Sequence, residues 1–115
     1  MHNFRNLKIW QKSRILVKEV FLLTRDFPAE EKFVLTSQIL RSAYSIPSNI
    51  AEGSGRSSNK EFVRFLDIAL SSAFELETQL ILASDIGYLS ENKLEKILTI
   101  LQEIQKMIYS FKTSL

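Results

Sequence analysis

The stretch Gln38–Arg64, QILRSAYSIPSNIAEGSGRSSNKEFVR, decides the predicted fold. Its apolar residues follow helical spacing from the start, and Pro47 lies within this helical segment. The helical pattern ends at Gly53–Gly55, and a second helical pattern begins after Ser58. Ser58 and Glu61 form a capping-box pattern, in which the hydroxyl and the carboxylate each satisfy a backbone N–H of the first turn. Two helices joined by a tight turn are therefore expected.

Composition limits both the fold and the chemistry. The chain has 115 residues, which suits a single domain over residues 1–115 with a core of its own. Three glycines and two prolines are too few for the many turns of an all-β fold. Without cysteine, and with His2 as its only histidine, the chain is expected to hold no disulfide, no metal and no cofactor.

The sequence also predicts the cellular compartment of the protein. The first ten residues, MHNFRNLKIW, lack the apolar region of a signal peptide, and no apolar run approaches the roughly 18 residues that span a bilayer. The lack of cysteine fits a reducing compartment. We therefore expect a cytoplasmic protein without a membrane partner.

Helical spacing predicts four helices: about Leu7 to Arg25, Ala29 to about Gly53, Ser58 to about Asp85, and a last one after Ser90. Their expected boundaries are an Asn6 cap, a Pro28 start, positive φ at Gly53 and Gly55, a C-cap at Gly87 and an N-cap at Ser90. The stripe expected to be buried in the second helix is Phe33, Leu35, Ile39, Ala43, Ile46 and Ile50. Short connections then give an all-α, antiparallel up-down-up-down four-helix bundle.

Pro47 breaks a local rule inside the second helix. It removes one backbone donor and crowds the carbonyl of Ala43. The helix either ends at Ser45 and restarts at Pro47, or continues with a kink; we expect the kink because apolar spacing continues across the proline. Asn49 is then either an amide that repairs backbone bonds near the kink or a recognition or subunit contact.

Charge is unevenly distributed along the chain. Residues 1–18 carry five bases and no acid, whereas residues 65–115 carry seven acids and four lysines. These are either solvated helix faces or a surface for an anionic partner such as RNA or DNA. Aromatic residues do not interleave with the bases, so stacking on single-stranded bases is not expected. The candidate nucleic-acid-binding residues are Lys8, Lys12, Arg14, Arg41, Arg56, Lys60 and Arg64.

Apolar side chains outnumber what one bundle needs. Trp10, Val17 and Phe21 form a second strip beside the core stripe of the first helix, and Ile100 and Met107 do so in the last. Either an irregular bundle buries these strips, or the chain is a homo-oligomer, which we expect. The residues assigned to structure or assembly are Trp10, Pro47, Asn49, Glu52, Gly53, Gly55 and Glu61.

No catalytic motif is apparent. The chain lacks a phosphate-binding glycine loop with lysine and a nucleophile paired with histidine. Its carboxylates, Glu52 and Glu61 included, are expected to cap, pair or hydrogen-bond. We therefore expect a protein that is not an enzyme.

Several segments are distinctive together: FRNLKIW at 4–10, Phe27-Pro28, QILRSAYSIPSNIAEGSGRSSNKEF at 38–62, ELETQL at 75–80 and GYL at 87–89. With them the chain resembles the four-helix bundle proteins encoded in intervening sequences of bacterial 23S ribosomal RNA. The resemblance implies a homopentamer with a central channel. It also implies similarity to the accessory variability protein of diversity-generating retroelements, a basic pentameric barrel that binds nucleic acid and a reverse transcriptase.

Two functions follow from charge and resemblance together. One is a non-enzymatic, oligomeric protein that binds structured RNA, ribosomal RNA in particular, through basic surfaces. The alternative is a protein–protein adaptor for a neighbour-encoded enzyme such as a reverse transcriptase. Co-purification after nuclease treatment discriminates between them.

Overall fold

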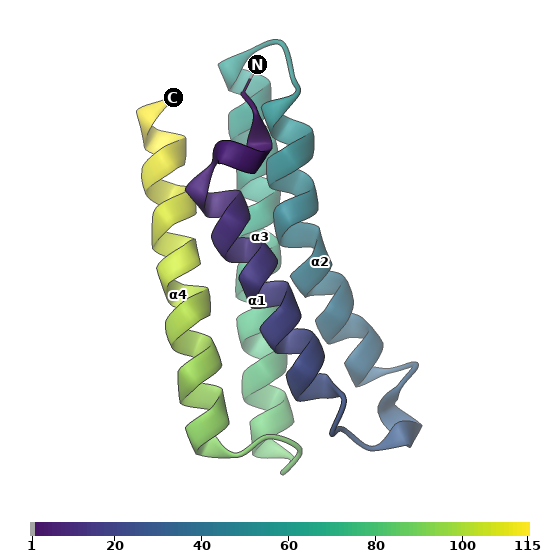
Figure 1. Ribbon diagram of the computed structural model, residues 1–115. Helices are drawn as coiled ribbons and strands as arrows, with labels where there is room; N and C mark the ends of the chain where they lie inside the picture. Colours follow the sequence, from purple (N-terminus) through teal and green to yellow (C-terminus); the bar gives the residue numbers. More distant parts are fainter. Residues whose placement is uncertain (1) are drawn as a thin grey trace.

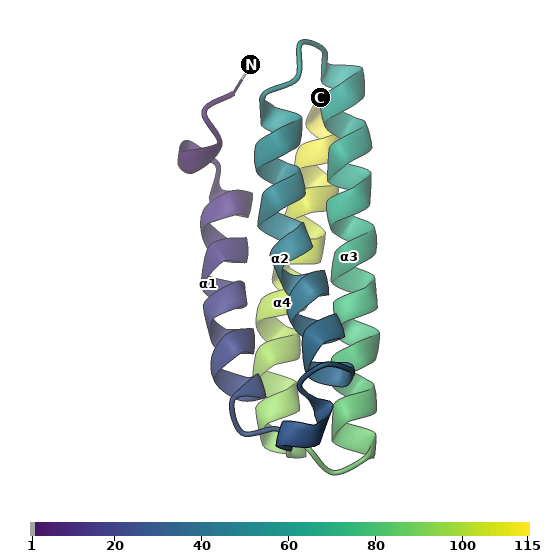
Figure 2. The ribbon, with the colours of Figure 1, turned by 90° about the vertical axis from the view of Figure 1, so that its right-hand side faces the viewer.

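The computed structural model describes residues 2–115, and these form a four-helix bundle, so the predicted fold class is confirmed (Figure 1). In Figure 1 consecutive helices run in opposite directions, and both termini lie at the end that carries the α2–α3 turn. Figures 1 and 2 together place α1 and α3 across the bundle from each other, with α2 and α4 between them. The elements are η1 (Phe4–Asn6), α1 (Lys8–Thr24), η2 (Ala29–Glu31), α2 (Leu35–Ser54), α3 (Asn59–Asp85) and α4 (Glu91–Ser114).

The core is built from one apolar stripe of each helix, as the 3.6-residue period requires. Small buried residues occur on both α2 and α3: Ala43 on α2, and Ala69 and Ala73 on α3. Small side chains let these two helices approach closely. The fully buried large side chains are Leu16, Val20, Ile39, Ile46, Ile50, Phe62, Leu66, Leu76, Leu80, Leu101, Ile104 and Ile108.

The start of the first helix differs from prediction. Leu7 occupies the cap position of α1 without a side-chain hydrogen bond, so the predicted Asn6 cap is wrong. Residues before α1 instead form η1, whose cap is Asn3 through a bond from the Arg5 N–H to Oδ1. The segment then folds back on the bundle, because the His2 N–H donates to the Ser54 carbonyl.

The second helix begins later than predicted. Pro28 caps only the single turn of η2, and Val34 then takes a non-helical conformation with φ −118° and ψ −98° before α2 starts. Phe33 lies in this elbow with 86% of its surface exposed, so its predicted place in the buried stripe is wrong. Leu35 is half-buried, while Ile39 and the later members of the stripe are buried as predicted.

Neither glycine near the end of α2 has a positive φ, so that prediction is also wrong. Gly53 is helical and buried, and Gly55 caps α2 with φ −87°. Among residues 2–115, Gly87 alone has a positive φ, at 90°. It follows α3 in a Schellman turn, in which the Tyr88 N–H donates to the Ala83 carbonyl and the Gly87 N–H to Ser84.

Serine hydroxyls begin the last two helices as predicted. The Ser58 hydroxyl accepts a bond from the Glu61 N–H at 3.2 Å, and Ser90 accepts one from the Lys93 N–H at 3.2 Å. The predicted end of α3 at Asp85 is confirmed. The reciprocal bond from the Glu61 carboxylate stays a prediction.

Helix α2 is continuous through Pro47, so the alternative of two separate helices is wrong. The bend predicted at Pro47 stays a prediction. Asn49 donates from Nδ2 to the carbonyl and the hydroxyl of Ser45, at 2.8 and 2.9 Å. The Asn49 amide therefore bonds within its own helix. The Ser45 hydroxyl also forms a hydrogen bond with the Ser72 hydroxyl of α3, at 2.8 Å.

None of the helices in the described part of the chain is long and apolar enough to cross a membrane.

Candidate nucleic-acid interface

One end of the bundle gathers basic residues from separate parts of the sequence. Arg56 lies in the α2–α3 turn, and Lys60 and Arg64 lie four residues apart in the first turns of α3, so they share one face. All three side chains are exposed. The sequence-predicted cluster is therefore present for these three residues, and we call this end the basic end.

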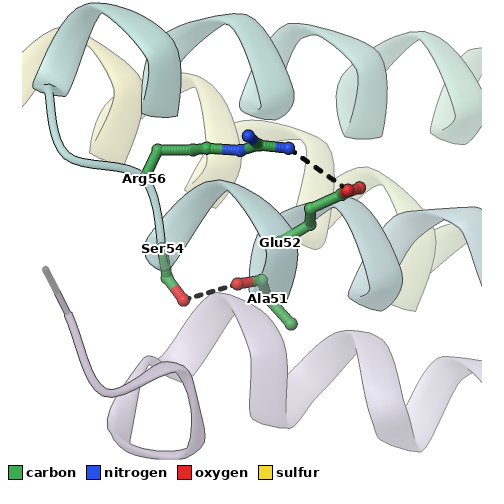
Figure 3. Close-up of polar contacts among 4 residues, drawn as sticks. All are labelled: Ala51, Glu52, Ser54 and Arg56. Carbon is green, nitrogen blue, oxygen red and sulfur yellow. Dashed lines mark hydrogen bonds and ion pairs between the residues drawn. The ribbon is translucent and has the colours of Figure 1, made fainter.

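Arg56 is held in place by its neighbours (Figure 3). Its guanidinium Nη2 lies 3.3 Å from Oε1 of Glu52, one helical turn away, and its Cζ lies 4.6 Å from the ring centroid of Phe65. Beside it, the Ser54 hydroxyl donates to the Ala51 carbonyl at 2.7 Å. An exposed ion pair adds little stability, so these contacts mainly orient the guanidinium.

The N-terminal part of α1 reaches the same end. Lys8 lies beside Ser110 and Ser114 in the last turns of α4. Lys12, one turn further along α1, is paired with Glu103 of α4 at 2.6 Å. Of these two candidates, Lys8 extends the basic end, whereas Lys12 lies one turn further away from it along α1.

Two basic residues that the sequence did not single out belong here as well. Lys112, in the last turn of α4, pairs with Asp67 of α3 at 2.9 Å. Arg5 belongs to η1, which lies against α2 at this end, and its guanidinium is 5.9 Å from the Phe4 ring centroid. Lys112 was predictable, because antiparallel packing of α3 and α4 brings the end of one helix to the start of the other.

Arg14 and Arg41 lie away from the basic end. Arg41 is in the second turn of α2, and the 14 residues to Gly55 correspond to about 21 Å of helix. Arg14 lies on α1 with its Cζ 5.6 Å from the Trp10 ring centroid. Both line open grooves between α1 and α2. The predicted grouping of Arg41 with Arg56, Lys60 and Arg64 is therefore wrong.

An aromatic ring lies beside two of the candidate basic residues, four residues away in sequence for Arg14 and nine residues away for Arg56. Arg14 lies near Trp10 and Arg56 near Phe65, as described above. The expectation that aromatic and basic residues do not interleave therefore holds for the sequence and not for the surface. These rings are in contact with guanidinium groups of the same chain, so they do not form free platforms for bases.

The single histidine of the chain takes part in aromatic packing. The ring of His2 packs 5.2 Å from the Phe62 ring and 6.0 Å from the Phe111 ring, measured between centroids. Within residues 2–115 there is no group of three histidine or acidic side chains that could hold a metal ion. What the basic end offers is the exposed side chains of Lys8, Lys60 and Arg64, beside Arg56 and Lys112, which are ion-paired with Glu52 and Asp67.

Comparison with known proteins places the chain in a family. The family model described as 23S rRNA-intervening sequence protein matches residues 5–110. A crystal structure of a protein of unknown function from the S23 ribosomal protein family of Bacteroides thetaiotaomicron VPI-5482 is 33% identical, with a TM-score of 0.84. The match covers 90% of this chain and 97% of that one. No curated protein matches. The chain belongs to the 23S rRNA-intervening sequence protein family.

Proposed function

We propose that this protein is a non-enzymatic, homo-oligomeric, cytoplasmic protein that binds structured RNA, ribosomal RNA in particular, through its basic end. The observation that carries the proposal is the convergence there of Lys8, Arg56, Lys60, Arg64 and Lys112 from three helices and a turn. Such a surface binds phosphates of a folded RNA without reading its sequence. The aromatic rings beside Arg14 and Arg56 already lie against guanidinium groups, so single-stranded bases are a poorer fit.

Subunit repetition strengthens this proposal. One chain has a formal net charge of only +2, which is weak for holding a polyanion. A closed ring places one basic end per subunit around the same axis and multiplies the local positive charge. The family resemblance implies five subunits, and we adopt that number in the proposal.

Binding of 23S ribosomal RNA fragments, measured by gel shift or fluorescence anisotropy at low and at physiological salt, tests the proposal. We expect micromolar or tighter binding that weakens steeply as salt rises, since bound cations on the RNA are released by each phosphate contact. A DNA duplex of equal length and a single-stranded RNA serve as comparison ligands. Absence of salt-sensitive binding at micromolar protein overturns RNA binding.

A protein–protein adaptor for a neighbour-encoded enzyme, such as a reverse transcriptase, is the second candidate. It is favoured by the exposure of large apolar side chains, most of all Phe33 with 86% of its surface accessible. Co-purification from native cells with and without nuclease separates the two candidates. A protein that stays bound after nuclease treatment supports the adaptor, and one lost with the RNA supports RNA binding.

A further inference from the structure

A long apolar groove runs between α1 and α2. It consists of two adjoining depressions of about 480 and 560 Å³ that share Tyr44. Phe21 and Tyr44 are each 46% exposed, although both are large aromatic residues. We call this the α1–α2 groove; its main apolar residues are Trp10, Val17, Phe21, Phe33, Leu40 and Tyr44.

The charged residues of this groove are all basic. Arg14 lines the depression nearer the basic end, and Arg25, Lys32 and Arg41 line the other. No acidic side chain is among the lining residues of either depression. The groove therefore presents an apolar floor with a positive rim.

A ridge of the opposite character lies on α3. Exposed residues recur there every seven positions, so they form one narrow strip: Asp67, Ile68, Phe74, Glu75, Ile81 and Leu82. Phe74 is 54% exposed and Leu82 is 50% exposed. We call this strip, with Asp85 at its end, the α3 ridge. The ridge itself carries three acids, Asp67, Glu75 and Asp85, and no base, whereas Arg64 and Lys106 line the depressions beside it.

From this complementarity we infer that the α1–α2 groove of one subunit receives the α3 ridge of a second copy of the chain. Contact between the apolar residues of the α1–α2 groove and those of the α3 ridge excludes water from both surfaces. The basic residues at the edge of the groove then lie near acidic residues of the ridge, and this charge pairing determines which surface binds and how the two surfaces align. Asp85 makes no side-chain bond among the described residues, whereas Asp67 and Glu75 already accept bonds from Lys112 and Ser42.

The two surfaces match in length and cannot meet within one chain. The groove residues on α2 run from Thr36 to Ala51 and the exposed ridge residues on α3 from Asp67 to Leu82, so each set spans 15 helical steps, or about 22 Å. Helices α1 and α3 lie across the bundle from each other with α2 and α4 between them, so the α3 ridge does not reach the α1 side of the groove in its own chain (Figure 2). A contact between different surfaces is head-to-tail, and it closes into a ring when the rotation per subunit allows.

This inference rests on the oligomer in the proposed function and not on RNA binding. It adds which two surfaces meet. It also assigns Arg14 and Arg41 to the subunit contact, and it leaves Arg56 and Lys60, which precede the ridge along the chain, open for RNA.

Two interface variants test the head-to-tail contact by light scattering. The groove variant carries Phe21→Glu and Tyr44→Glu, and the ridge variant carries Phe74→Lys and Leu82→Lys; all four side chains are substantially exposed, so the fold tolerates them. Ile15→Glu and Tyr109→Lys are matched controls, since both residues are exposed and line neither surface. Circular dichroism checks that every variant is folded.

The inference predicts an oligomer for the wild type and the controls, and a single-chain mass of 13.3 kDa for each interface variant. In a mixture of the two variants, the intact ridge of the groove variant can bind the intact groove of the ridge variant. A dimer of twice the single-chain mass therefore forms, and it cannot add further subunits because its two outer surfaces are the mutated ones. A wild type of single-chain mass overturns the inference together with the proposed oligomer. Interface variants that keep the wild-type mass, or a mixture that stays single-chain, overturn the inference alone.

Discussion

A β-carbon added at Gly53 of α2 would lie 2.6 Å from the β-carbon of Phe65 on α3. It would also lie 2.9 Å from Cδ1 of Phe62. Neither helix can retreat easily, because Phe62 is buried and the connecting turn is short. The absence of a side chain at Gly53 therefore sets the close approach of α2 and α3 next to the basic end.

Gly53→Ala is expected to destabilise the fold by roughly 1–3 kcal/mol, because the new methyl group overpacks this contact. Chemical denaturation measures the loss. Gly55→Ala is the control, since a β-carbon there would meet only the Glu52 carbonyl at 3.6 Å and φ is already −87°. Equal stability of the two variants would contradict the close-packing explanation.

Neutralising the basic end should weaken RNA binding without changing assembly. In the variant Arg56→Gln, Lys60→Gln, Arg64→Gln, we expect at least a tenfold weaker affinity at low salt. The slope of log affinity against log salt should fall by about 1 for each lost phosphate contact.

The matched control for that variant is Lys93→Gln with Lys96→Gln at the start of α4, at the other end of the bundle. It should bind almost as the wild type does. If both variants lose affinity equally, binding follows total charge, and the basic end is not the binding surface.

Replacing Pro47 tests whether the backbone hydrogen bond that is missing from α2 at this position has a role in assembly or RNA binding. Pro47→Ala restores a donor for the Ala43 carbonyl, so helix content should stay the same or rise. We expect weaker assembly or RNA binding, because Arg41 and the basic end lie on opposite sides of Pro47 along α2. Ser48→Ala is the neighbouring control. A Pro47→Ala protein that assembles and binds like the wild type would make the proline a tolerated irregularity.

Because of Tyr88, the stability of the folded protein should decrease as pH rises in the alkaline range. Its hydroxyl donates to Oε2 of Glu31 at 2.8 Å, and this hydrogen bond, with smaller effects of desolvation and of the charges on Glu31 and Glu30, raises the pKa of Tyr88 above 10.0. A raised pKa means that the folded state favours the neutral phenol. The stabilisation is therefore present below pH 10 and is lost as pH rises through the folded-state pKa.

Comparing thermal unfolding of the wild type with Tyr88→Phe between pH 7 and 11 isolates this contribution. The wild type should be more stable at neutral pH, and the difference should shrink above pH 10. A difference that is independent of pH would show that the Tyr88 hydroxyl contributes through packing alone.

The sequence by itself determined the elements whose causes are local. Apolar spacing predicted four helices, and the serines Ser58 and Ser90 predicted two helix starts correctly, because a cap bonds to N–H groups only a few residues away. The same holds for the end of α3, where Gly87 alone among the described residues needs positive φ. The family assignment also followed from segments of sequence.

Only the tertiary structure decided the features that depend on residues far apart in the chain. Gly53 was read as a turn glycine, yet its role is to admit the side chains of Phe62 and Phe65 from the next helix. Phe33 was assigned to the buried stripe although it lies only two residues before Leu35, off the helical spacing of the other members. Helix α2 begins only after the non-helical Val34, and Phe33 is exposed.

The same distinction between local sequence and tertiary structure applies to the charged surfaces. Arg41 and Arg56 are close in sequence, yet about 21 Å of helix places Arg41 in the α1–α2 groove and leaves Arg56 at the basic end. Lys8 and Lys112, by contrast, reach that end from opposite termini of the chain. Charge content is a property of the sequence, but which charges share a surface is set by how antiparallel helices pack, since packing joins residues by position along the bundle and not by order along the chain.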